Sequence, residues 1–380
     1  SSSRSINRIK LMKRFLLILV AIFLLAPSAQ AAIAIKPLTK VGQVDSDATG
    51  IVAFASQIMV YGNREKNGFA QFIDGSTVEL SCGVESFVSA ATVDTDGNFY
   101  LVGSSSNPIV GTLPPISGVL NPDNVVPDPV SSNKSDPVTL CIWKLDGTGK
   151  IIDSQTTMMN SPVIGYSILA DKFGVTVGGA AYANPGNNGF ILNWNGKPTY
   201  IGRNSTSVFA MARTTDGGVI AVGSSSDKLL NTSLKGKQDG FLAKIVNGKL
   251  ISVQRSSDIK ATRSWRSATS NLLLGGYSNS SAVITKFASN FQPTWTSRYP
   301  SNGAAFTATV GKLNYGAFVS TGAIKALPSW KRKNAILLLT FDSKGVISAA
   351  NYLNSPQIDG FTATSALGPM LLSGGFLYRA

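Results

Sequence analysis

Residues 207–256 read SVFAMARTTDGGVIAVGSSSDKLLNTSLKGKQDGFLAKIVNGKLISVQRS, and this stretch decides the fold. Four short runs rich in apolar and β-branched residues are separated by polar or glycine-containing segments, a pattern that predicts four β-strands. The Asp-Gly pair at residues 216–217 and the Asn-Gly pair at 247–248 favour tight hairpins, because these residues accept positive φ. The stretch therefore predicts an antiparallel meander of four strands.

The same phrase returns along the whole chain, and each copy contains an apolar run that closes on glycine. The closing glycines are Gly62, Gly103, Gly178, Gly223, Gly275, Gly322 and Gly374. Repeats of roughly 40–50 residues are typical of solenoids, propellers and arrays. Four-stranded units with no helical segment between them predict an all-β propeller, in which each blade covers the apolar face of the next. An array of β-sandwiches is the rival interpretation.

Seven glycines predict seven blades, with six or eight blades as alternatives. The expected blades span residues 51–84, 87–157, 160–204, 206–258, 262–300, 302–355 and 358–380. The last copy is short, and an open ring would expose a long strand edge. We therefore expect the N-terminal phrase at residues 33–45 to complete the last blade, so that residues 32–380 form one closed domain.

The N-terminal segment has the pattern of a secretory signal peptide. Lys13 and Arg14 precede an apolar run at residues 15–26, and a small-x-small triplet follows at residues 29–31. This order of basic start, short apolar run and A-x-A site describes a cleavable signal over residues 1–31. Residues 1–11 are an upstream extension if Met12 is the start, and an uncleaved anchor is the alternative. We expect a protein that is secreted or held in the periplasm or cell envelope, with no other membrane span.

Composition limits the possible functions. The chain has no histidine, which excludes Ser-His-Asp and Cys-His nucleophiles and histidine-ligated metals. The formal charge of +14 favours anionic partners, but the basic residues are scattered, which argues against nucleic acid. In an exported chain Cys82 and Cys141 either pair in a disulfide or remain two buried thiols.

No cofactor is expected, with calcium as a weak alternative. Asp94, Asp96 and Asn98 alternate as in the start of a calcium loop, but Ser105 stands where such a loop needs its bidentate glutamate. An ordinary hairpin turn explains the same residues.

The loops between second and third strands are long and irregular, and they share one face with the connections between blades. The longest, residues 104–138, is rich in proline, and loops of this length are uncommon unless functional or disordered. On this face we place the candidate ligand-binding residues, a tryptophan that could stack on a sugar and six cations that could meet acidic groups: Trp330, Lys331, Arg332, Lys333, Lys228, Lys235 and Lys237. The opposing interpretation is a tryptophan that covers the blade edge beside a solvated basic turn.

Residues 219–254, with their Gly-Ser close, polar loop and Asp-Gly-Phe-x-Ala-Lys opening, resemble the bacterial beta-propeller repeat of exported and cell-surface proteins. The resemblance covers most of the chain after residue 31 in outline and implies a fold and an exported setting, with no catalytic residues. The hypothesis drawn from the sequence is a monomeric, non-catalytic module that binds a protein or a glycan, acidic or neutral, at the cell surface. A glycan hydrolase or lyase on a propeller scaffold and a structural envelope component are the alternatives.

Overall fold

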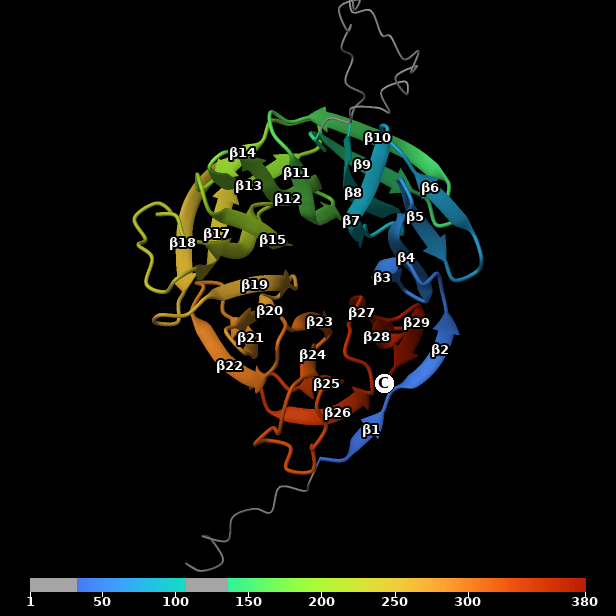
Figure 1. Cartoon of the computed structure of the whole chain (residues 1–380), viewed down its shortest axis with the longest axis vertical. Coiled ribbons are helices and arrows are strands. Elements are labelled where there is room, and N and C mark those ends of the chain that lie inside the picture. Colours follow the sequence, from blue (N-terminus) through green and yellow to red (C-terminus); the bar gives the residue numbers. More distant parts are fainter. Residues whose placement is uncertain (1–32, 107–135) are drawn as a thin grey trace, which may run out of the picture. The chain divides into compact units, whose positions relative to one another are not determined.

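The computed structural model describes residues 33–106 and 136–380, and these residues form strands and turns without any helix. From Ile35 onward the strands make seven sheets arranged in a ring (Figure 1). Within each blade, strands consecutive in the chain pair antiparallel. The seven-bladed β-propeller predicted from the sequence is confirmed. The described residues accordingly include no helix that could cross a membrane.

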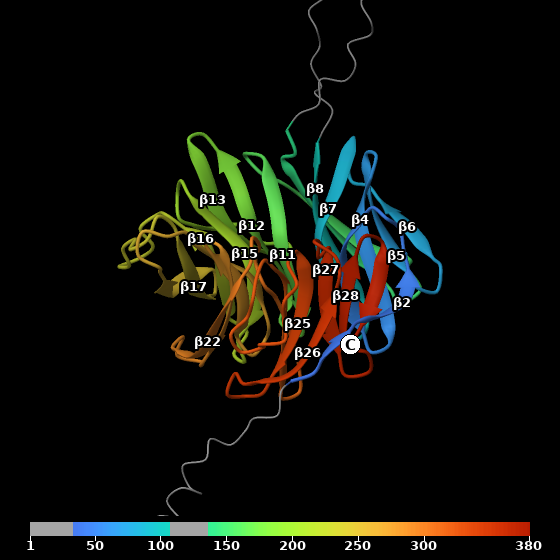
Figure 2. The ribbon, with the colours of Figure 1, turned by 60° about the horizontal axis from the view of Figure 1, so that its bottom comes forward.

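The blades follow one another in chain order. The first four are β3–β6 (Ala48–Phe54, Gln57–Arg64, Asn67–Phe72, Thr77–Leu80), β7–β10 (Glu85–Val93, Phe99–Ser106, Thr139–Leu145, Ile151–Met158), β11–β14 (Val163–Asp171, Gly174–Ala183, Gly186–Asn193, Thr199–Ile201) and β15–β18 (Thr206–Arg213, Val219–Ser225, Asp239–Val246, Lys249–Ser256). The fifth and sixth are β19–β22 (Arg263–Ala268, Leu273–Ser278, Ser281–Phe287, Pro293–Pro300) and β23–β26 (Phe306–Val310, Leu313–Ser320, Ala335–Phe341, Ile347–Leu353), and the seventh combines β27–β29 (Gly360–Thr364, Gly368–Ser373, Phe376–Arg379) with β2 (Thr39–Gln43). The first strand of each blade lies nearest the axis of the ring (Figures 1 and 2).

The N-terminal segment closes the ring. Strand β2 pairs antiparallel with β29 as the outer strand of the seventh blade, which confirms the expected closure. Strand β1 (Ile35–Pro37) pairs in parallel with β26 of the sixth blade, an addition that the sequence did not predict. Because both β26 and β29 would otherwise present free edges, one short segment covers two edges and links two blades.

The apolar core lies between the blades. Strands β8 and β16 are buried along their whole length, whereas the outer strand β10 is mostly exposed. The two middle strands of a blade are covered on both faces by its neighbours, which explains their almost continuous apolar sequence. Between the first two blades, for example, Phe72 packs edge-on against Phe99 at 5.1 Å between ring centroids.

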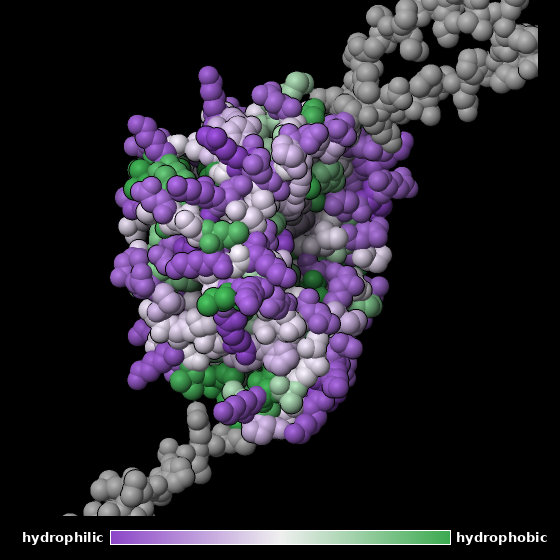
Figure 3. All heavy atoms as spheres, turned by 60° about the vertical axis from the view of Figure 1, so that its left-hand side comes forward, coloured by the Kyte–Doolittle hydropathy of each residue, from purple (hydrophilic) through white to green (hydrophobic). Residues whose placement is uncertain are grey.

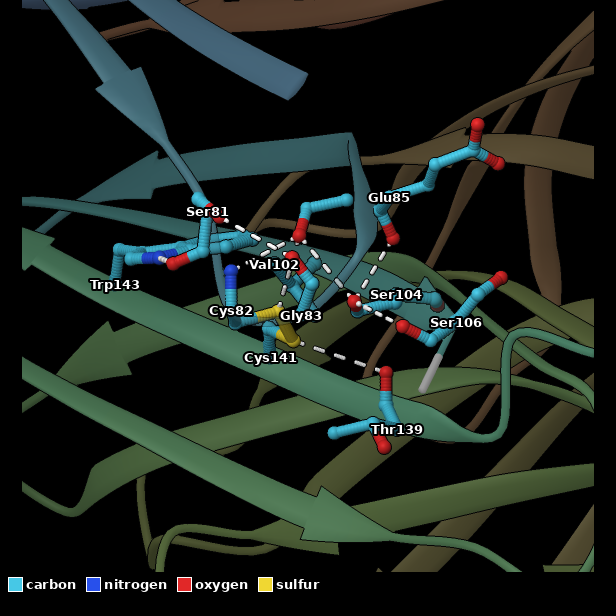
Figure 4. Close-up of a disulfide and its surroundings, with 12 residues drawn as sticks. Ser81, Cys82, Gly83, Glu85, Val102, Ser104, Ser106, Thr139, Cys141 and Trp143 are labelled. Carbon is cyan, nitrogen blue, oxygen red and sulfur yellow. Dashed lines mark hydrogen bonds between the residues drawn. A yellow bond between two sulfur atoms is a disulfide. The ribbon is translucent and has the colours of Figure 1, made fainter. Parts of the chain in front are cut away.

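Cys82 and Cys141 form a disulfide, with their Cα atoms 6.4 Å apart (Figure 4). Cys82 lies in the connection that follows β6, and Cys141 lies in β9. The structure thus shows the bonded state, one of the two alternatives that the sequence left open. The bond joins the exit of the first blade to a middle strand of the second.

Candidate functional site

One end of the ring, here named the loop face, is formed by the loops between second and third strands and by the connections between blades. The opposite end carries the short turns within the two hairpins of each blade. The long loops of the fourth and sixth blades, residues 226–238 and 321–334, are on the loop face. Of the expected proline-rich loop at residues 104–138, the part from 107 to 135 lies outside the described residues, as does the expected signal segment.

A pocket of about 670 Å³ opens on the loop face near the axis. Its wall includes residues of the inner strands β11, β15, β19 and β23, which neighbour one another around the axis (Figure 1). The lining residues come from the third to the sixth blades: Tyr166, Phe209, Arg266, Tyr277, Asn279, Asn302, Gly303, Ala304 and Phe306. The four aromatic residues among them are half-buried, and Arg266 is exposed.

The aromatic side chains and the arginine of this pocket are in direct contact. The rings of Tyr166 and Phe209 lie 5.0 Å apart between centroids, tilted by 56°. The guanidinium carbon of Arg266 lies 3.6 Å from the centre of the Phe209 ring and 5.6 Å from that of Tyr277. Such cation–π contacts hold a guanidinium in place while leaving its charge available.

Tyr166 is fixed by a second tyrosine. Its hydroxyl lies 2.5 Å from that of Tyr182, so the two phenols share a hydrogen bond. Burial, and then this hydrogen bond, raise the pKa of Tyr166 well above its usual value, although the nearby positive charge of Arg266 opposes the shift. Tyr166 is therefore a neutral phenol at physiological pH, and the positive charge of the pocket comes from Arg266.

β-Bulges position the key side chains. In β11, β15 and β19 the pairing with the second strand skips one residue, which is Tyr166, Phe209 and Arg266 respectively. A bulge leaves its extra residue unpaired and redirects the side chain. Thr49 and Ser89 occupy the same position in the first two blades. The same bulge therefore carries large side chains in three consecutive blades and small ones in two others.

Trp330 lies elsewhere and is buried. Only 2% of its surface is exposed, its indole nitrogen donates to the Ser320 hydroxyl at 3.0 Å, and its ring packs edge-on near Tyr352. Ile324 and Leu327 of the same loop are also buried, and backbone hydrogen bonds run from Leu327 to Ile324 and from Trp330 to Leu327. The ring has no free face on which a ligand could stack, so Trp330 acts in blade packing.

The cations beside Trp330 differ from one another. Arg332 donates to the Tyr352 hydroxyl and to the side-chain oxygen of Asn354, both at 3.1 Å. Lys331 and Lys333 are exposed, and within the described ranges no carboxylate pairs with either. These residues form a basic rim on the loop face, and none of them lines the pocket.

The lysines of the fourth blade also lie on this face, outside the pocket. Lys228, Lys235 and Lys237 are exposed on a loop whose backbone is anchored. The buried carboxylate of Asp239 accepts the backbone N–H groups of Lys235 and Gly236, each at 2.9 Å. The structure therefore places the expected cations on two separate fixed loops and does not gather them into one site.

The candidate calcium residues form a hairpin turn. The Asp94 carboxylate accepts the backbone N–H groups of Asp96 and Asn98 and the Asn98 side-chain amide, each at 2.9 Å. Burial acts to raise the pKa of Asp94, but these hydrogen bonds lower it overall. The carboxylate oxygens are thus engaged within the turn.

The pocket was not predicted from the sequence. Its residues are dispersed over 141 positions from Tyr166 to Phe306 and belong to no short motif. One signal was present in the repeat alignment: Tyr166, Phe209 and Arg266 fill a position at which the first two copies have threonine and serine. Large side chains at one repeat position can meet only if the ring brings the inner strands together.

Comparison with solved structures shows the fold. Virginiamycin B lyase from Staphylococcus aureus is 10% identical, with a TM-score of 0.51, over 90% of this chain and 99% of the lyase chain. A catalytically inactive variant of that lyase, in which one histidine is replaced by alanine, was solved with quinupristin and is 11% identical with the same TM-score, over 90% and 98% of the two chains. A chain of the mitotic checkpoint complex is 9% identical, with a TM-score of 0.51, over 93% of this chain and 96% of its own. No protein-family model matches the sequence, and no curated protein matches it.

Proposed function

We propose that the protein is an exported, non-catalytic binding module that takes a glycan or a protein segment of the cell surface into the pocket on the loop face. The observation that carries this proposal is the contact between half-buried aromatic rings and an arginine that no described carboxylate pairs with. The volume of about 670 Å³ lies within the usual range of ligand pockets, roughly 300–1,000 Å³.

The pocket favours binding over a purely structural role. A structural component of the envelope has no need to keep four aromatic rings partly exposed in one place, because they are more stable when buried. Figure 3 shows the wall on the side of β18 and β22, where hydrophilic side chains predominate and apolar groups form separate patches. The aromatic residues of the pocket are therefore best explained by a ligand.

An enzymatic role has less support. The lyase named above loses its catalytic activity when one histidine is replaced, and the present chain contains no histidine. The described residues that line the pocket include no aspartate or glutamate, whereas glycan hydrolysis by acid and base would need a pair of carboxylates. What the pocket offers is aromatic surface, amide groups and one fixed positive charge.

Export is supported by three features of the chain. The basic and apolar pattern of residues 13–31 is that of a secretory signal. The disulfide is typical of proteins that fold in an oxidising compartment. The resemblance of residues 219–254 to a repeat of exported propellers points the same way.

The test is an array of glycans and peptides probed with the wild-type protein and with Gly303→Trp. A side chain added at Gly303 would enter open space and suffer no backbone strain, so the tryptophan should fill the pocket without unfolding the blade. Ser329→Trp adds the same side chain on the exposed loop of the sixth blade and is the control. We expect the Gly303 variant to lose binding and the Ser329 variant to retain it. Equal binding by all three proteins would place the ligand elsewhere and overturn the proposal.

A further inference from the structure

We infer that the ligand of this pocket is a carboxylate-bearing sugar, with the carboxylate on Arg266 and the sugar ring against Phe209 and Tyr166. The inference rests on the proposed function and narrows it from glycan or protein to one chemical class. It follows from three properties of the pocket: Arg266 has no described ion-pair partner, the surface beside it is aromatic, and the described lining carries a single charge.

Arg266 is positioned to receive an anion. The guanidinium carbon lies over the Phe209 ring, 3.6 Å from its centroid, so the two groups are in van der Waals contact. Stacking of this kind occupies the face of the group and leaves its in-plane N–H donors free. No described residue accepts a hydrogen bond from Arg266, and none forms an ion pair with it. The fork of donors therefore suits a bidentate carboxylate.

Arginines in two other pockets of the protein are already paired. In a pocket of about 430 Å³ near the end of β4, Arg64 forms an ion pair with Asp45. In a pocket of about 450 Å³ on the opposite end of the ring, Nε of Arg213 lies 2.8 Å from the Asp171 carboxylate. Carboxylates of the described residues thus pair with those two arginines, and none of them pairs with Arg266.

The surface beside Arg266 suits a sugar ring. The rings of Tyr166 and Phe209 meet at 56°, and the half-buried face they present can take the C–H groups of a pyranose. Asn279 and Asn302 add exposed side-chain amides that can hydrogen-bond hydroxyl groups. Gly303 leaves open space on the same wall. Aromatic faces, amides and an anion receptor are the three contacts that an acidic sugar needs.

The charge of the pocket favours a carboxylate over a phosphate. Arg266 is the only lysine, arginine, aspartate or glutamate among its lining residues. A phosphate monoester carries nearly two negative charges and is normally met by several donors or cations. One arginine balances the single charge of a carboxylate.

The experiment measures binding to pairs of related glycans, one member acidic and the other neutral. The probes are galacturonan with its methyl ester, glucuronan with glucan, and sialylated with desialylated oligosaccharides, together with poly-glutamate and inorganic phosphate. We expect the wild-type protein to prefer the acidic member of at least one pair. Arg266→Gln should weaken that binding by about 10- to 100-fold, the usual worth of a charge-assisted contact, and should leave the neutral member unchanged. Arg266→Lys should recover only part of the affinity, because lysine cannot stack and bind in bidentate fashion.

Lys331→Gln with Lys333→Gln is the control for a general charge effect, because both lysines lie on the basic rim outside the pocket. This double variant should bind the acidic glycan like the wild type. Equal affinity for acidic and neutral members, preference for phosphate, or the absence of binding to every acidic glycan would overturn the inference. Binding to poly-glutamate alone, lost in Arg266→Gln, would also overturn it in favour of an acidic peptide, and the proposed function would stand. Binding that is unaffected by Gly303→Trp would instead reject the proposed function itself.

Discussion

At the scale of single residues, the repeated glycines have a steric cause. Gly62, Gly103 and Gly223 each pair with the inner-strand residue that directly precedes a bulge. A Cβ atom at Gly103 or Gly223 would collide with a backbone carbonyl oxygen of the inner strand, and one at Gly62 would collide with the carbonyl oxygen of the residue just before that strand. At Gly223 the missing Cβ therefore permits the bulge that carries Phe209 into the pocket, and at Gly62 and Gly103 it permits the bulges that carry Thr49 and Ser89. Gly322 and Gly374 lie beyond the ends of their strands, in blades whose inner strands have no such bulge.

Replacing Gly223 with alanine tests this cause. The new methyl group would meet the carbonyl oxygen of Ser207, and the strands would have to separate. We expect Gly223→Ala to lower the free energy of unfolding by about 1–3 kcal/mol, as overpacking usually does. Gly303→Ala, which enters open space, is the control and should change it by less than about 0.5 kcal/mol. Urea unfolding of both variants measures the difference, and equal stabilities would refute the steric explanation.

Trp330 tests the distinction between packing and binding. Removal of its buried ring leaves a cavity and deprives the Ser320 hydroxyl of its indole donor. We expect Trp330→Ala to lower the free energy of unfolding by about 3–5 kcal/mol. The exposed neighbours Lys331 and Lys333, changed to glutamine, should have an effect within about 0.5 kcal/mol. If Trp330→Ala is as stable as the wild type but no longer binds the ligand, Trp330 belongs to the binding site and the packing explanation is wrong.

At the scale of elements, the loops are built as fixed parts of the ring. The loop of the fourth blade reaches back to the connection between the third and fourth blades. There one oxygen of Asp227 accepts the backbone N–H groups of Arg203, Asn204 and Ser205 at 2.9–3.1 Å and the Thr206 hydroxyl at 2.7 Å. The carboxylate thus latches one blade to the next.

This latch predicts a pH-dependent stability. Burial acts to raise the pKa of Asp227, but the hydrogen bonds from the connection outweigh it and lower the pKa. A carboxyl group with a lowered pKa in the folded state stabilises the protein above its unfolded pKa, and the contribution is lost as the pH falls through the folded value. We expect Asp227→Asn to cost about 1–2 kcal/mol at pH 7, since the carboxylate is partly exposed. The difference from wild type should shrink below about pH 4.

Asp96→Asn provides the matched control for Asp227→Asn. Asp96 is an exposed aspartate in a turn, and its side chain accepts no hydrogen bond from the described residues. Urea unfolding at pH 7 and at pH 3 should show no loss for this variant. If Asp227→Asn behaves in the same way at both pH values, the carboxylate does not act as a latch.

At the scale of the whole molecule, ring closure depends on the N-terminal segment. Residues 35–43 cover the edges of the sixth and seventh blades. These residues lie near the start of the sequence, whereas the strands they pair with lie near its end. A signal cleaved after residue 31, as the sequence predicts, would leave both strands in place. Removal of the predicted signal would therefore not prevent the N-terminal strands from closing the ring.

Shortening the chain tests this closure. A protein without residues 1–43 loses the outer strand of its seventh blade and the strand added to the sixth, whereas a protein without residues 1–34 keeps both. We expect the shorter protein to be less stable by at least about 3 kcal/mol, given several lost backbone hydrogen bonds of roughly 1 kcal/mol each. Its free edges should also promote association. Urea unfolding and size-exclusion chromatography compare the two, and equal behaviour would show that the ring holds without the N-terminal strands.

The fold class, the number of blades and the segment that closes the ring could all be predicted from the amino-acid sequence. These properties follow from local patterns: strand periodicity, turn residues and a glycine that recurs near the end of one strand in each copy, each of which acts within one blade. The residues that form the pocket could be identified only from the tertiary structure. Tyr166, Phe209 and Arg266 meet because three bulged inner strands converge on one axis, and distance along the chain carries no information about that convergence. Burial of Trp330 was settled in the same way, since only the packed loop decides whether an aromatic ring faces solvent or the blade.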